Sequence, residues 1–170
     1  MRPILALMLT LSTTATALAG GLDVDIELPR IDVADYRRPY VAVWIERPDN
    51  SVAANLSVWY DAKMRNDEGE KWLKDMRQWW RRIGRGVEVP IDGVTAATRM
   101  PGKHRLSFTA GQTPLGTLAA GEYRLVVEAA REHGGREILH LPFHWPATQP
   151  VQSSAQGRHE LGTVSLGVTP

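Results

Sequence analysis

The sequence predicts a mainly β protein: an antiparallel sandwich of the immunoglobulin or fibronectin type III kind, with one tryptophan-rich helix inserted between strands. Three observations predict this fold class. Short segments alternate apolar with polar residues, turn-forming Gly, Pro, Asn and Asp separate them, and one segment has helical spacing instead. We expect residues 20–170 to form a single domain, a length that suits one hydrophobic core.

Residues 1–19 have the composition of a secretory signal peptide. Arg2 precedes an apolar run from Ile4 to Leu11, and Ala17-Leu18-Ala19 forms an A-x-A cleavage site. The run is far shorter than the roughly 20 residues that cross a bilayer. We therefore expect cleavage near Ala19, a soluble periplasmic protein and no direct insertion into the membrane.

The strands are expected where apolar residues recur at every second position. In the first, from Leu22 to Leu28, acidic residues occupy the positions between the apolar ones. Six more segments are expected strands: 40–46, 56–60, 104–109, 122–129, 137–145 and 161–168. About seven short strands are typical of such a sandwich. Gln149 to His159 is poor in apolar residues, and we expect a mobile loop there.

One segment, Glu70 to Arg82, breaks the β pattern and is expected to be a helix. Its apolar residues fall near i, i+4, i+7, i+8 and i+11 and make a broad aromatic face: Trp72, Leu73, Met76, Trp79, Trp80 and Ile83. The helix either caps an open end of the sandwich, with its tryptophans as core anchors, or presents part of this face to a planar cofactor or a partner.

Composition excludes several functions. The chain has no cysteine, which excludes disulfides, thiolate metal sites and cysteine nucleophiles. Lys+Arg 20 nearly balances Asp+Glu 19, which argues against a nucleic-acid partner. The sequence has no hydrolase motif either. The residues alone therefore give no motif typical of a stand-alone enzyme.

The segment most suggestive of chemistry runs from Asp92 to Thr98 and reads D-G-V-T-A-A-T. It lies between Pro90 and Pro101-Gly102, so we expect an exposed connection. The segment resembles the flavinylation motif of proteins that carry FMN on a threonine through a phosphoester bond, such as subunits of the sodium-pumping quinone reductase.

That resemblance implies Thr98 as the modified residue, with Asp92, Gly93, Thr95 and Ala97 as recognition positions. Ala96 stands where Gly or Ser is commoner. Small neighbours permit a flavin transferase to approach the hydroxyl, Gly93 permits a tight turn, and Arg99 is suited to pair with the phosphate. In the alternative interpretation the segment is only a turn, with Asp92 as a cap and the two threonines in local hydrogen bonds.

A wider resemblance covers most of the mature chain. From Asp92 to Gly102 and from Gly121 to Gly135 the sequence is similar to a bacterial family of predicted periplasmic proteins of unknown function. Members of that family tend to accompany PepSY-domain membrane proteins and flavin transferases in iron acquisition. The resemblance implies a periplasmic redox role with a flavin transferase and a membrane PepSY-type reductase as partners.

Three hypotheses follow. The first is an electron carrier with FMN on Thr98, whose ring would stack on Trp79 or Trp80, with Tyr123 as a weaker candidate. The second is a cofactor-free binding module that presents a sheet edge or the tryptophan-rich helix. The third is a metal-handling protein that uses histidines, since imidazole is the commonest transition-metal ligand; the candidates are His104, His133, His140 and His144.

Overall fold

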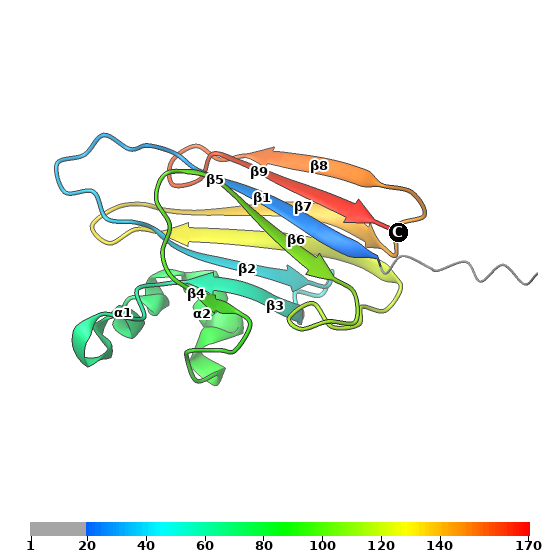
Figure 1. Cartoon of the computed structure of the whole chain (residues 1–170), viewed down its shortest axis with the longest axis horizontal. Coiled ribbons are helices and arrows are strands. Elements are labelled where there is room, and N and C mark those ends of the chain that lie inside the picture. Colours follow the sequence, from blue (N-terminus) through cyan, green and yellow to red (C-terminus); the bar gives the residue numbers. More distant parts are fainter. Residues whose placement is uncertain (1–19) are drawn as a thin grey trace, which may run out of the picture.

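The computed structural model describes residues 20–170, which form two β-sheets (Figure 1). One sheet has the strand order β5-β1-β9-β8 and the other the order β4-β3-β2-β6-β7. The strand bounds are β1 Gly21–Leu28, β2 Tyr40–Glu46, β3 Val52–Trp59, β4 Thr95–Ala96, β5 Gly102–Thr109, β6 Gly121–Ala130, β7 Arg136–Trp145, β8 Val151–Gln156 and β9 Thr163–Thr169. The expected signal peptide, residues 1–19, lies outside the described residues.

The main core lies between the two sheets, as the alternating pattern predicts. Leu22, Val24, Ile26 and Leu28 of β1 are all at most 2% exposed, while the residues between them stay partly exposed. They belong to one cluster with apolar residues of β2, β6 and β9. Burying each such side chain contributes about 1.5–3 kcal/mol. The mainly β sandwich is therefore confirmed; the immunoglobulin or fibronectin type III connectivity stays a prediction.

The tryptophan-rich segment is not one helix from Glu70 to Arg82, so that prediction is wrong. It consists of α1 (Glu68–Lys71), the 3₁₀ turn η2 (Leu73–Asp75) and α2 (Arg77–Arg82), flanked by the 3₁₀ turns η1 (Arg65–Asp67) and η3 (Gly84–Gly86). Met76, with φ −76° and ψ 73°, leaves the helical conformation between η2 and α2. The apolar residues keep helical spacing across this break because η2 and α2 pack against the same face of the five-stranded sheet.

Buried Glu128 of β6 explains where α2 begins. Its carboxylate accepts hydrogen bonds from the backbone N–H groups of Gln78 (3.1 Å) and Trp79 (2.7 Å), in the first turn of α2. The Arg136 guanidinium also donates to it, at 2.5 Å. Because a buried charge must be paired, this carboxylate fixes the start of α2 over the sheet.

The helical segment covers the outer face of the five-stranded sheet and not an open end of the sandwich (Figure 1). Met76 and Trp79 are fully buried there against Trp44 and Val58, in a second apolar cluster. Trp72 is only half-buried. Of the tryptophans on the expected apolar stripe, therefore, Trp79 is a core anchor and Trp72 is not.

The predicted mobile loop from Gln149 to His159 is also wrong, because residues 151–156 form β8. This strand pairs with β9 at the edge of the four-stranded sheet. β8 has no fully buried residue on either face, and its sequence accordingly lacks an apolar repeat. The chain after it is held by Glu137, whose carboxylate accepts four backbone N–H groups between Arg158 and Leu161.

Among residues 20–170, none of the helices combines the length and apolar character that spanning a membrane requires.

Candidate functional site

The D-G-V-T-A-A-T segment begins with a tight turn. The backbone N–H groups of Val94 and Thr95 both donate to the carbonyl oxygen of Ile91, and the Thr95 hydroxyl accepts a hydrogen bond from the Ile91 N–H at 2.8 Å. Gly93 has φ +69°, a left-handed conformation that strains any residue with a side chain. The glycine and the first threonine of the segment thus have local structural roles.

The middle of the segment is strand β4, so the expectation of a purely irregular connection is corrected. β4 runs parallel to the end of β3, and the carbonyl oxygens of Val94 and Ala96 accept hydrogen bonds from the N–H groups of Val58 and Tyr60. Val94 is buried, whereas Asp92, Gly93 and Ala97 are exposed. The segment is therefore anchored at its centre and accessible on both sides.

Thr98 lies where the chain crosses from one sheet to the other. β4 is an edge strand of the five-stranded sheet and β5 an edge strand of the four-stranded sheet, and residues 97–101 join them (Figure 1). Thr98 is half-exposed. Within residues 20–170 the Thr98 hydroxyl makes no hydrogen bond, whereas the Thr95 hydroxyl accepts one from the Ile91 N–H. The Thr98 hydroxyl is thus partly exposed, and no hydrogen bond to another described residue occupies it.

Arg99 lies over the indole ring of Trp59, with 4.2 Å between its guanidinium carbon and the ring centroid. Trp59 is fully buried at the end of β3, and His104 of β5 contacts it edge-on at 5.7 Å. No ion pair in the described part of the chain includes Arg99. Burial lowers the pKa of Arg99 from its usual value. A cation–π contact holds this guanidinium, and among residues 20–170 no carboxylate pairs with its charge.

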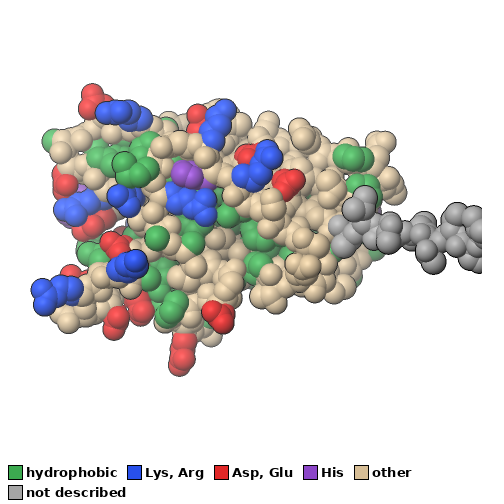
Figure 2. Space-filling model, viewed as in Figure 1, with side chains coloured by type: hydrophobic (Ala, Val, Ile, Leu, Met, Phe, Trp, Pro, Cys, Tyr) green, Lys and Arg blue, Asp and Glu red, His purple; other side chains and the backbone are tan. Residues whose placement is uncertain are grey.

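A groove of about 370 Å³ adjoins this crossover. It lies between the connection from β1 to β2 and the residues after Arg99, and it is lined by Arg30, Ile31, Asp32, Val33, Tyr36, Met100 and Pro101. Met100 is 56% and Val33 43% exposed, which is high for apolar side chains. Figure 2 shows hydrophobic side chains gathered over the β1–β2 connection, beside a histidine and basic side chains.

The aromatic residues proposed to stack on a flavin lie elsewhere. Trp79 is fully buried and its indole N–H donates to Asn55 at 3.1 Å. Trp80 is half-buried beside it, with ring centroids 6.5 Å apart. Tyr123 is buried near the start of β6 and stacks on Phe143 at 5.7 Å. Of the three, only Trp80 is partly exposed.

The four candidate histidines are spread over β5, the turn between β6 and β7, and β7. His104 interacts with the Met100 carbonyl oxygen at 2.8 Å, His133 occupies the turn between β6 and β7, and His140 and His144 are exposed on β7. In residues 20–170, no three His, Asp or Glu side chains are grouped so that they could bind a metal ion.

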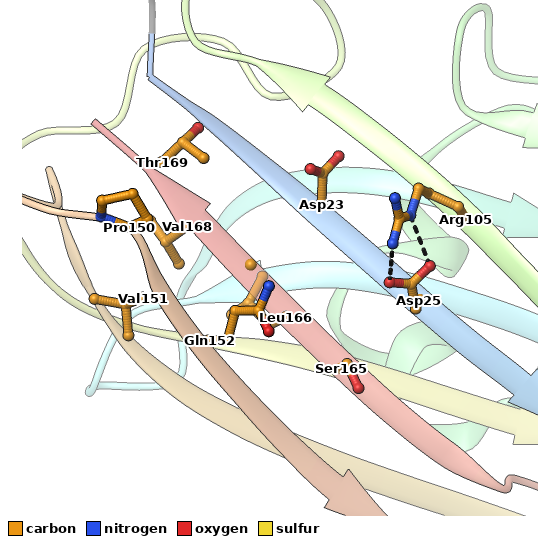
Figure 3. A pocket seen from close by; sticks show the side chains of 11 residues that line it. Asp23, Asp25, Arg105, Pro150, Val151, Gln152, Ser165, Leu166, Val168 and Thr169 are labelled. Atoms are coloured by element: carbon orange, nitrogen blue, oxygen red, sulfur yellow. Dashed lines mark hydrogen bonds and ion pairs between the residues drawn. The ribbon is translucent and has the colours of Figure 1, made fainter.

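A second hollow lies on the outer face of the four-stranded sheet (Figure 3). Its main feature is the ion pair between Arg105 and Asp25, whose two hydrogen bonds measure 2.8 and 2.7 Å. The bond from Arg105, more than the opposing effect of burial, holds the pKa of Asp25 below its usual value. This satisfied surface pair contains no residue of the segment and indicates no chemistry.

Sequence reasoning missed Trp59 and the groove. Trp59 lies on the opposite parity of its strand from Val58, which is the one signal that it faces the inner core. The groove is formed by segments far apart in the chain, so no local pattern could indicate it.

The fold and the site define a small β-sandwich protein whose distinctive surface is a threonine and an arginine on a crossover between sheets. The family model described as predicted periplasmic protein (DUF2271) matches residues 21–163, and the chain belongs to this family. The protein is thereby assigned to the periplasm. The chain has no significant match among the curated proteins or the solved structures.

Proposed function

We propose that this protein is a periplasmic electron carrier with FMN attached to Thr98 as a phosphoester. A flavin transferase would load it, and a membrane PepSY-type reductase would supply electrons for a purpose such as ferric-chelate reduction. When bound, the flavin supplies reversible one- and two-electron transfer, which no side chain of this chain offers.

The observation that carries the proposal is the different use of the two threonine hydroxyls. The Thr95 hydroxyl accepts a hydrogen bond that closes the turn, whereas Thr98 is half-exposed on a backbone fixed at both ends by strands. A transferase needs a hydroxyl that can be aligned with a diphosphate. Thr98 meets that need, and the exposed Asp92, Gly93 and Ala97 provide recognition positions beside it.

Thr98 is the nucleophile of the proposed transfer, and the reaction balances. A bond forms between Thr98 Oγ1 and the FMN phosphorus of FAD, the diphosphate bond breaks, AMP leaves, and the hydroxyl proton is released. The product adds a phosphodiester anion at the surface. Arg99, with no carboxylate partner within residues 20–170, is placed to pair with it by fork-like donation.

The departure from the motif at Ala96 is compatible with the site. Ala96 is in β4, partly buried against the main core, and its carbonyl oxygen pairs with Tyr60. Only a small side chain is needed there, and alanine satisfies this requirement as Gly or Ser would.

A cofactor-free binding module is the second candidate, favoured by the exposed apolar side chains of the groove. It predicts a colourless protein under all conditions. No comparable observation favours the histidine-based metal hypothesis, because the described residues contain no cluster of three His, Asp or Glu side chains that could bind a metal ion.

Co-expression with a flavin transferase and export to the periplasm tests the proposal. After a denaturing gel, the parent protein should fluoresce under ultraviolet light, and Thr98→Ala should be dark. Thr117→Ala, which removes an exposed threonine between β5 and β6, should fluoresce like the parent. A dark parent beside a fluorescent known acceptor would favour the binding module instead.

A further inference from the structure

We propose that the groove between the β1–β2 connection and Met100 binds the isoalloxazine ring of the flavin. This inference rests on the proposed attachment at Thr98 and names the surface that holds the ring.

The groove concentrates the exposed apolar side chains of the molecule. Four large hydrophobic residues are exposed among residues 20–170, namely Val33, Val87, Met100 and Val151, and two of them line this one groove. Exposed apolar side chains that cluster mark binding surfaces, whereas scattered ones need no explanation. Half-buried Tyr36 adds an aromatic ring to the same lining.

The groove is within reach of Thr98. Met100 is two residues further along the chain, and consecutive Cα atoms are about 3.8 Å apart. A phosphate on Thr98 would lie beside Arg99, and the ribityl chain would span the short remaining distance to the groove. Thr98 and Arg99 would therefore hold the phosphate, and the groove that begins at Met100 would hold the ring at the other end of the ribityl chain.

The polar residues of the groove also match the ring. The pyrimidine edge of isoalloxazine carries both carbonyl oxygens and an N–H group. Arg30 and Asp32, both exposed in the lining, provide a donor and an acceptor respectively. Fully buried Trp79 has no free face for a ring. The groove thus offers the ring an exposed apolar surface that Trp79 does not.

The test measures the fluorescence anisotropy of the attached flavin in Val33→Asp, with Val151→Asp as control. Both substitutions place a charge at an exposed valine (43% and 48% exposed), but only Val33 is in the groove and neither is in the motif. Intact mass verifies FMN in each sample, and thermal unfolding verifies the fold. Val33→Ser repeats the test without a charge.

In the parent, anisotropy should be well above its value in urea and emission should be quenched. In Val33→Asp, anisotropy should fall at least halfway towards the urea value, with a smaller fall in Val33→Ser and none in Val151→Asp. Two results would overturn the ring site but not the attachment at Thr98. One is a loaded parent whose flavin tumbles as freely as in urea, and the other is equal anisotropy in Val33→Asp and Val151→Asp. Loss of FMN from Val33→Asp would assign Val33 to transferase recognition and overturn the ring site too. An unmodified parent overturns both proposals.

Discussion

Thr95 and Thr98 carry the same side chain three positions apart, and the backbone gives them different roles. The Thr95 hydroxyl belongs to the turn that starts at Ile91, while the Thr98 hydroxyl lies on the crossover beside Arg99. A hydroxyl already committed to a backbone N–H is a poor acceptor for transfer, because the reaction would leave that donor unpaired. The proposed distinction between Thr95 in recognition and Thr98 in attachment rests on this difference.

Thr95→Val should therefore lower the fraction of protein that carries FMN, and the FMN should still be attached at Thr98. Valine keeps the shape of threonine but removes the acceptor for the Ile91 N–H, at a cost of about 0.5–1.5 kcal/mol in the free energy of unfolding. Intact mass after co-expression should show a reduced fraction of FMN-bearing protein, and urea unfolding should show the loss of stability. Loading equal to that of the parent would contradict the recognition role.

Glu137 provides a pH-dependent prediction. Burial raises the pKa of its carboxyl, but four backbone N–H donors outweigh burial and hold the pKa below its usual value of about 4.5. A depressed pKa means stabilisation that is fully present above the unfolded-state pKa and lost as pH falls through the folded-state pKa. Glu137→Gln should lower the free energy of unfolding by about 1–3 kcal/mol at pH 7.

Urea unfolding at a series of pH values checks this. The parent and Glu137→Gln should converge in stability as pH falls below about 4.5. Glu122→Gln, at an exposed position of β6, should match the parent throughout. A difference between parent and Glu137→Gln that stays constant down to pH 2 would show that the ionised carboxylate is not what these N–H groups require.

At the scale of elements, the helical segment shows how a correct periodicity can conceal a broken helix. The apolar residues of 70–83 recur as a helix requires because they all face the same sheet. What divides the segment is Glu128, which lies far away in the sequence and binds the N–H groups of Gln78 and Trp79. No local pattern could reveal that interaction.

Trp79→Ala and Trp72→Ala test this packing as a matched pair. Trp79 is fully buried and hydrogen-bonded to Asn55, so its truncation should cost about 3–5 kcal/mol. Trp72 is half-buried, and its truncation should cost roughly half as much or less. Thermal unfolding of both variants measures the difference. Equal costs would contradict the assignment of Trp79, and not Trp72, as the core anchor of this segment.

Strands with a recurring apolar residue were predictable, including the edge strands β5 and β7, whereas the edge strands β4 and β8 were not. The seven expected strands all exist: β1 alternates buried with partly exposed residues, while β2 and β6 are buried on both faces and are rich in apolar residues. β4 and β8 were missed, since a two-residue strand and a polar edge strand carry no such alternation. For the site, the segment and its turn could be predicted from residue types. The groove and the contact between Arg99 and Trp59 required the fold.

At the scale of the whole molecule, the family assignment places the protein in the periplasm, as the signal peptide expected in residues 1–19 predicts. β1 begins at Gly21, directly after the expected cleavage site, and pairs with both β5 and β9. Retaining an attached cofactor is useful outside the cytoplasm, since a dissociable flavin would diffuse away.

The mature protein should begin at Gly20 or within a few residues of it. Small residues around Ala19 fit the cleavage enzyme, and Gly20 already accepts a hydrogen bond from Ala110 in the fold. Intact mass of the periplasmic protein measures the end directly. Periplasmic protein that retains Met1 would contradict the cleavage site.

The central claim is that Thr98 carries FMN, and peptide mapping by tandem mass spectrometry tests it most directly. Protein co-expressed with a flavin transferase is digested, and the peptide that contains Thr95 and Thr98 is fragmented. The account predicts an added mass of FMN less one water, located on Thr98 and absent from Thr98→Ala. Unmodified peptide, or the same mass on Thr95, would contradict it.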